Sequence, residues 1–168
     1  MNDEINDMFR QLSRDHMHAI WERAKANELD ELNDEDRQLA KIMLEHEDEY
    51  SNEFEFADVL HDFEYDPETE TNPFLHILIH LIVENQLQAR DPIETYQFYL
   101  AMRRKKVTHH DAIHLIGSIV TPLVFQALKQ MQPFDLTLYK RLLRIYRDKK
   151  PERIASALNK DLDFIFKE

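Results

Sequence analysis

Two pairs of histidines in this sequence share one spacing. His76 and His80 form a His-x3-His pair, and His110 and His114 form a second. Residues four apart in an α-helix project from the same face, one turn from each other. Two imidazole rings at that spacing can reach one metal ion from a single helix. The four histidines are therefore candidate metal ligands.

The residue types limit which metal these ligands would hold. The chain has no Cys, which excludes thiolate zinc sites, iron–sulfur clusters and a disulfide scaffold. Nitrogen and oxygen ligands alone favour zinc, iron, nickel or manganese as the cofactor. Four histidine ligands would fill the coordination shell of the ion, as in a structural or storage site. Three histidine ligands and one water molecule are typical of a catalytic site. Glu84, one turn beyond His80, is a further candidate ligand or general base, although a hydrogen-bonded surface Glu fits the pattern better.

The elements that must position these histidines are predicted to be helices throughout. Apolar residues recur at steps of three and four, and several helix start signals punctuate the chain. These signals are Asn33, Asn72-Pro73, Asp91-Pro92, Thr108 with Asp111, Asp135, and Lys150-Pro151. The predicted helices cover residues 3–25, 34 to about 46, 72–88, 92–105, 108–131, 135 onward and 151–166. Pro122 is expected to kink the fifth of the long helices or end it early.

The predicted fold is all-α, a helical bundle with additional C-terminal helices. One domain is expected over 1–168, with a central His-bearing bundle at 35–131 and appended helices at 135–168. If the helices at 72–88 and 108–131 run parallel, both histidine pairs lie at nearly the same height, offset by roughly 3 Å. If the second helix runs antiparallel to these two, His46, near its C-terminal end, would face the same end of the bundle.

The segment 51–71 interrupts this pattern. It is acidic, it carries Phe54, Phe56, Phe63 and Tyr65, and it shows no sustained helical period. We expect a long connection there, with one short helix over 56–62.

Charge is divided unevenly along the chain. Residues 1–70 hold 23 acidic and 6 basic side chains, whereas the remainder holds 10 acidic and 15 basic ones. The acidic half would repel nucleic acid, which makes nucleic acid an improbable partner. The acidic start lacks the features of a signal peptide, and the apolar run 74–83 is shorter than a membrane span. The expectation is a cytoplasmic protein without a membrane partner.

The motifs carry a resemblance to a known family. The run Asn72-Pro73-Phe74-Leu75-His76-x3-His80, with Gln86-Leu87 and Pro92 after it, resembles an uncharacterised bacterial family in which such a segment precedes a His-x3-His helix. Here the second element is His110-Asp111-Ala112-Ile113-His114. The resemblance covers roughly residues 35–130 and implies that the four histidines belong together. It implies no activity.

Three functions remain open at this point. The first is metal binding through the paired His-x3-His motifs. The second is an HD-type metal-dependent phosphohydrolase, in which His76 or His80, His110-Asp111 and Asp161 supply the ligands. In that alternative Asp111 binds metal, whereas in the first it caps a helix together with Thr108. The third is a non-catalytic protein-interaction domain, with the acidic connection or the basic helix after 135 as the binding surface, or a homo-oligomer.

Overall fold

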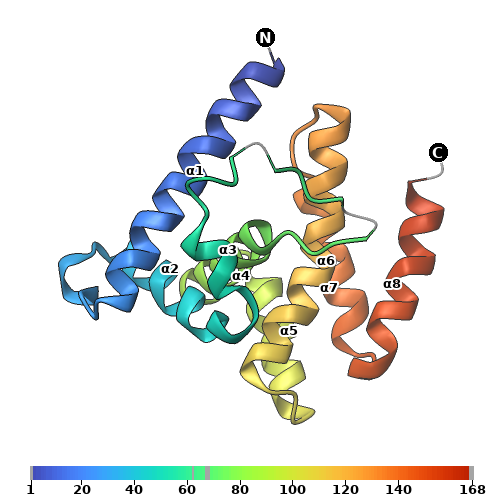
Figure 1. The fold of residues 1–168 in the computed structure, drawn as a ribbon. Helices are drawn as coiled ribbons and strands as arrows, with labels where there is room; N and C mark the ends of the chain where they lie inside the picture. The colour runs from blue at the N-terminus through green and yellow to red at the C-terminus, as the bar shows by residue number, and fades with distance from the viewer. Residues whose placement is uncertain (1, 62, 67–68, 167–168) are drawn as a thin grey trace. The chain divides into compact units, whose positions relative to one another are not determined.

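The computed structural model describes residues 2–61, 63–66 and 69–166, with side chains described from residue 13 onward. Among these residues there are eight α-helices, one short 3-10 helix and no strand, which confirms the all-α prediction (Figure 1). The helices are α1 (Asn2–Lys25), η1 (Leu29–Glu31), α2 (Asp34–Glu45), α3 (Glu47–Glu55), α4 (Pro73–Ala89), α5 (Ile93–Arg104), α6 (His109–Gln130), α7 (Leu136–Arg147) and α8 (Pro151–Ile165).

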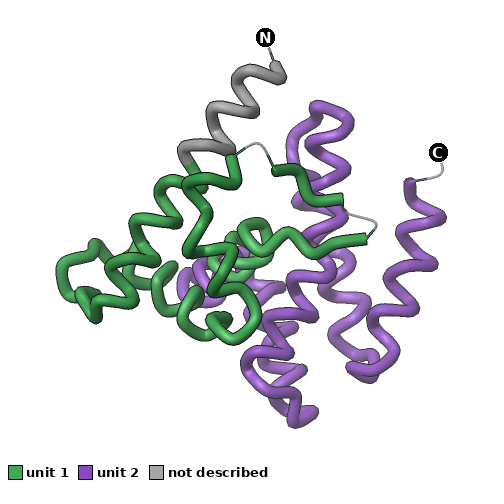
Figure 2. Tube along the Cα trace, in the orientation of Figure 1, with its two compact units in different colours: residues 1–81 green, residues 82–168 purple. Residues whose placement is uncertain are grey.

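The chain divides into two compact units (Figure 2). Unit 1 comprises Met1–Leu81 and contains α1, η1, α2, α3 and the first half of α4. Unit 2 comprises Ile82–Glu168 and contains the second half of α4 and α5 to α8. The single domain expected over 1–168 stays a prediction.

The core of unit 1 is one apolar cluster to which α1, α2, α3 and α4 all contribute. Trp21 of α1 packs against Phe54 of α3 with ring centroids 5.3 Å apart, and its indole N–H donates a hydrogen bond to Glu55. Ile77 and Leu81 add the α4 contribution to the same cluster. The histidines at 76 and 80 are thus carried by a helix that is anchored in this core.

The core of unit 2 is built around α6, which packs against α5, α7 and α8. Its buried residues, among them Ile113, Ile116 and Val120, recur at steps of three and four. By length and composition alone, α6 could cross a membrane, but a buried core helix passes the same test. α7 packs against both α5 and α6 and buries Tyr139 and Tyr146.

Most of the predicted helix starts are confirmed by the hydrogen bonds of their caps. The side chain of Asn33 accepts from the backbone N–H of Asp36, that of Asn72 from Leu75, and that of Asp135 from Leu138. The Asp91 prediction is wrong: α5 begins at Ile93 with Pro92 in the capping position and without a side-chain cap. Pro92 therefore lies one position earlier than the first helical residue.

The prediction of a short helix over 56–62 is also wrong. The helix of this region is α3, which lies earlier in the chain, and the residues from Phe56 to Leu60 form hydrogen-bonded turns instead. Three acids at Glu47, Asp48 and Glu49 stabilise the N-terminal turn of α3, and the buried Phe54 fixes its C-terminal end in the core. Asp62, and residues 67–68 of the same connection, lie outside the described residues.

Pro122 does not end its helix early, because α6 continues from His109 to Gln130. The proline removes one backbone donor, but Leu123 directly after it is buried and keeps the helix in the core of unit 2. The helix ends instead at Met131, whose left-handed backbone closes the last turn.

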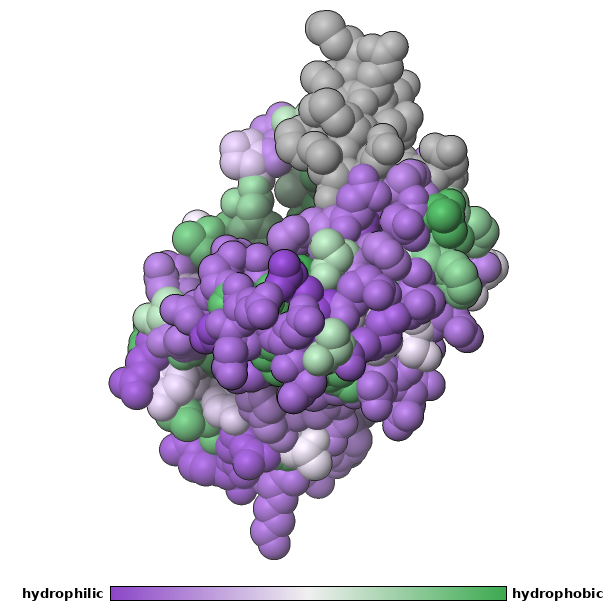
Figure 3. All heavy atoms as spheres, turned by 60° about the vertical axis from the view of Figure 1, so that its left-hand side comes forward, coloured by the Kyte–Doolittle hydropathy of each residue, from purple (hydrophilic) through white to green (hydrophobic). Residues whose placement is uncertain are grey.

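The face that Figure 3 brings forward, which includes α1 and α2, is mostly hydrophilic. This agrees with the excess of acidic side chains in residues 1–70.

Candidate metal centre

Three histidines lie together in unit 1. His46 follows α2 directly and precedes α3, while His76 and His80 lie one turn apart on α4. The ring centroid of His46 is 5.0 Å from that of His76 and 4.5 Å from that of His80. The two α4 rings are 4.8 Å apart. His46 and His80 are buried and His76 is half-buried, so the fold concentrates three imidazoles where little water reaches them.

The backbone of α2 fixes the orientation of the His46 ring. His46 is the C-terminal cap of α2, and its Nδ1 lies 2.8 Å from the carbonyl oxygen of Ile42. A carbonyl can only accept, so Nδ1 carries the hydrogen, and in the neutral ring Nε2 is the atom with the lone pair. A metal-ligating histidine is held in this way, by a backbone carbonyl on the nitrogen that does not bind the ion.

The nitrogen atoms of His46 and His76 face each other. Their Nε2 atoms are 3.2 Å apart. In a tetrahedral zinc site with Zn–N distances of about 2.0–2.1 Å, two ligand nitrogens are separated by roughly 3.3 Å. The separation suits either one shared hydrogen, donated by His76, or two ligands of a common ion.

An aromatic ring covers the histidines on one side. Tyr50 of α3 stacks nearly parallel to His46 at 6.3 Å and meets the edge of His76 at 5.6 Å. Burial raises the pKa of the Tyr50 hydroxyl, and the negative charge of Glu49 raises it further. The hydroxyl of Tyr50 therefore remains protonated, and its ring uncharged, beside the histidines at physiological pH.

Unit 2 contributes the second predicted pair. His110 and His114 lie at the start of α6 with ring centroids 4.2 Å apart. His110 is half-buried and His114 is exposed. The spacing of four thus brings the rings together on the helix as predicted, but in a setting more open than that of the unit 1 histidines.

A third residue of α6, which sequence reasoning missed, ties the start of this helix to its neighbours. His109 lies 2.7 Å from Glu84 of α4 through its Nε2, and its Nδ1 lies 2.9 Å from the hydroxyl of Tyr99 on α5. Because a carboxylate accepts, Nε2 carries the hydrogen and Tyr99 donates to Nδ1. Glu84 is thus a hydrogen-bonded Glu, as its pattern favours, and His109 is its partner. No spacing in the sequence links these two residues.

The carboxylates that an HD-type site would need have other partners. The backbone N–H of Asp111 donates to Thr108 Oγ1 at 3.1 Å, and that hydroxyl donates back to the Asp111 carboxylate at 2.6 Å. This reciprocal pair is the predicted cap of α6. Asp161 of α8 accepts a hydrogen bond of 2.6 Å from the hydroxyl of Tyr146. Both aspartates thus have structural roles within unit 2.

The sequence-predicted histidines are therefore brought together in pairs, His76 with His80 and His110 with His114. The structure adds His46 to the first pair, a residue whose place near the end of its helix made it a secondary candidate. Whether His76, His80, His110 and His114 bind one ion stays a prediction.

Comparison with known proteins identifies a family without a known activity. Neither the curated proteins nor the solved structures contain a match to this chain. The match to a family model runs from residue 9 to residue 145, which is wider than the range of 35–130 expected from the motifs and includes most of α7. Because this match covers most of its 168 residues, the chain belongs to the DUF1841 family, a domain of unknown function.

Proposed function

We propose that this protein binds a divalent transition metal ion through histidine side chains. The proposed ligands are His46, His80, His110 and His114, a group of imidazoles that could hold an ion. The observation that carries the proposal is the orientation of His46. Its Nδ1 donates a hydrogen bond to the Ile42 carbonyl, so Nε2 is the nitrogen that would bind the metal. The ring lies among the other imidazoles of unit 1.

Burial supports the same conclusion. His46 is 1% exposed and His80 is 4% exposed, so water has little access to either ring. An ion bound to their nitrogens would be shielded from competing water.

The contribution of unit 2 is supported by contacts at the start of α6. Glu84 binds His109, the residue directly before His110. On α4, which is continuous from Pro73 to Ala89, His80 precedes Glu84 by one turn. We therefore expect the His110–His114 pair to complete the coordination begun by His46 and His80.

His76 has a separate role to be tested. The sequence motif predicts that it is a ligand, and its Nε2 lies against Nε2 of His46. If His76 binds the ion, His76→Ala weakens metal binding as strongly as His46→Ala. If it only bonds to His46, its removal has the smaller effect of a supporting residue.

A ligand set made only of imidazoles suits zinc, nickel or iron, whereas manganese prefers oxygen ligands. Four histidines would fill a tetrahedral shell, which favours structural or storage binding over catalysis. We propose that the protein acts in the cytoplasm. We expect no nucleic-acid partner, because the acidic first half of the chain would repel a phosphate backbone.

The test is metal analysis of protein purified without a histidine tag, followed by thermal unfolding with and without added Zn²⁺ or Ni²⁺. A ligand that binds only the folded state raises the unfolding temperature. We expect about one ion per chain and a higher unfolding temperature. Substitution with Co²⁺ adds a visible spectrum whose intensity reports whether the coordination is tetrahedral.

A second readout is the pH dependence of binding. Histidine ligands must be neutral, and histidine in peptides titrates near pH 6.5, so metal affinity should fall steeply below that pH. The absence of bound metal together with the absence of metal-induced stabilisation would contradict the proposal. An affinity that does not change between about pH 7.5 and 5.5 would contradict histidine ligation.

A further inference from the structure

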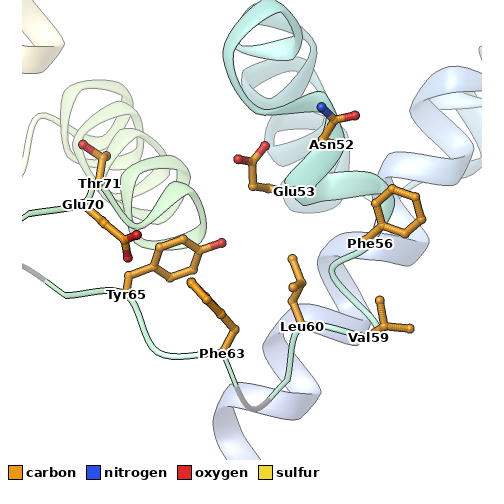
Figure 4. A pocket seen from close by; sticks show the side chains of 9 residues that line it. All are labelled: Asn52, Glu53, Phe56, Val59, Leu60, Phe63, Tyr65, Glu70 and Thr71. Atoms are coloured by element: carbon orange, nitrogen blue, oxygen red, sulfur yellow. The ribbon is translucent and has the colours of Figure 1, made fainter.

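Unit 1 carries an open pocket on the segment after α3 (Figure 4). Its volume is about 620 Å³. Apolar side chains form much of its wall, and several of them are unusually exposed: Phe56 is 54% exposed, Val59 71% and Phe63 45%. Clusters of exposed apolar side chains mark binding sites for other molecules more often than isolated ones do.

The rim of this pocket is negatively charged. Glu53 of α3 and Glu70 both line it, and Figure 4 shows their carboxylates on either side of the Tyr65 ring. Burial raises the pKa of the Tyr65 hydroxyl, and the charges of Glu53 and Glu70 raise it further, against the opposing charge of Arg14. Moreover, residues 42–89 contain neither Lys nor Arg. The pocket therefore combines apolar walls with an acidic rim, in a stretch of sequence that has no Lys or Arg of its own.

Two aromatic rings, that of Tyr65 in the pocket wall and that of Phe74 next to it, already contact a cationic side chain of this chain, Arg14. The guanidinium of Arg14 lies 5.8 Å from the ring centroid of Tyr65 and 4.9 Å from that of Phe74. It also donates a hydrogen bond of 2.8 Å to the carbonyl oxygen of Phe63. Arginine over an aromatic ring is a favourable electrostatic contact. The surroundings of Tyr65 thus accommodate a basic side chain next to apolar ones.

We propose that this pocket docks a basic, amphipathic segment of a partner protein. Apolar side chains of that segment cover Phe56, Val59 and Phe63, and a Lys or Arg lies between Glu53 and Glu70. The exposure of the walls favours a peptide over a small amine, because only an occupant lying across the surface can cover side chains that are 45% to 71% exposed. This inference is independent of metal binding.

The experiment uses the full chain and a fluorescein-labelled helical peptide of Leu and Lys, with a Leu and Glu peptide as its counterpart. Fluorescence anisotropy gives the affinity of each. We expect the Leu/Lys peptide to bind and the Leu/Glu peptide not to bind. Val59→Ser and the double variant Glu53→Gln/Glu70→Gln should each weaken binding of the Leu/Lys peptide by about tenfold or more. Val59 is so exposed that its replacement leaves the fold intact, which circular dichroism verifies.

Matched controls separate docking in the pocket from general attraction to an acidic protein. Glu28→Gln/Glu31→Gln removes the same number of charges elsewhere in unit 1, and Leu128→Ser removes an exposed apolar side chain in unit 2. Neither should change the affinity. Equal losses in the control and pocket variants would overturn the proposal. So would tighter binding of benzyltrimethylammonium than of the peptide, or a dimer of this chain that Val59→Ser dissociates.

Discussion

The two units bury polar side chains in different ways. Unit 2 buries Thr95 and two phenols, and each phenol hydroxyl donates to an oxygen acceptor. Tyr139 donates to Gln86 at 2.8 Å and Tyr146 to Asp161 at 2.6 Å. Unit 1 buries Arg14 and the imidazoles of His46 and His80. There nitrogen faces nitrogen: Nε2 of His46 lies 3.2 Å from Nε2 of the half-buried His76, with the ring of His80 beside both.

This difference separates structural burial from burial that suits a ligand. A phenol with a carboxylate or amide acceptor is satisfied within the protein, and nothing further is needed there. Between two facing imidazole nitrogens only one hydrogen can lie, whereas a metal ion can accept the lone pairs of both. The polar core of unit 2 therefore stabilises the fold, and that of unit 1 is suited to bind an ion.

The largest effect is expected from removing a buried imidazole of unit 1. His80→Ala should weaken the binding of Zn²⁺ by more than about 100-fold, because the loss of a ligand exceeds the 10- to 100-fold cost of losing a group that merely supports one. Competition with a chelating dye measures the affinity. His16→Ala is the matched control, since His16 is an exposed histidine of unit 1 that pairs with Asp36. Unchanged affinity in His80→Ala would show that His80 is not a ligand of the ion.

The buried phenol of unit 2 should affect stability at high pH and leave metal binding unchanged. Burial raises the pKa of Tyr139 to about 12, above its ordinary value of 10.0. The unfolded chain therefore loses this proton first, so the stabilisation is complete below pH 10 and is lost as the pH rises toward 12. The loss amounts to about 2–3 kcal/mol in the wild type.

The variant Tyr139→Phe has no hydroxyl group at this position, so it does not lose stability through ionisation there. The difference in unfolding free energy between variant and wild type, measured by urea denaturation from about pH 8 to 11, should therefore shift in favour of the variant above pH 10. A difference that does not depend on pH would indicate that the hydroxyl of Tyr139 is ionised as easily in the folded state as in the unfolded chain.

A smaller effect is expected from the exposed histidine of unit 2. If its imidazole binds the same ion as His80, His114→Ala should weaken metal binding by about 10- to 100-fold, less than His80→Ala does, because water can take the place of an exposed ligand more easily than that of a buried one. Without metal, the exposed position should change stability by less than about 0.5 kcal/mol. Equilibrium dialysis against Zn²⁺ and thermal unfolding of the metal-free protein measure the two quantities. Full affinity in His114→Ala would show that His114 does not bind the ion.

The sequence predicted much of the fold because its signals are local. Asn33, Asn72, Thr108 and Asp135 each cap a helix with their own side chain, and a cap needs only residues within one turn. The two histidine pairs were predictable for the same reason, since a spacing of four on a helix fixes that two rings are neighbours.

Contacts between distant residues could not be predicted in this way. The bond from His109 to Glu84 joins α6 to α4, and the hydrogen that fixes the His46 ring depends on where α2 ends. The position of α3 was missed because Phe54 and Ala57, which are fully buried, could be distinguished from the exposed Phe56 only once their neighbours in the core were known. Residue types alone do not say which of several aromatics is inside.

The smallest predicted effect concerns the cap of α6, the feature on which metal binding and the HD-type alternative disagree. Asp111→Asn removes a negative charge from the first turn of the helix but keeps an oxygen that can accept from Thr108. We expect a loss of about 0.5–1 kcal/mol in the unfolding free energy of the metal-free protein, and full retention of bound metal. Urea denaturation and metal analysis of the same preparation provide both numbers.

Asp135→Asn is the matched control, because Asp135 caps α7 in the same unit and no metal-binding role is assigned to it. If Asp111 is only a cap, the two variants lose similar amounts of stability and both keep their metal. If Asp111 is a ligand, as an HD-type phosphohydrolase requires, only Asp111→Asn loses the ion. That outcome would favour a metal site that includes a carboxylate of unit 2.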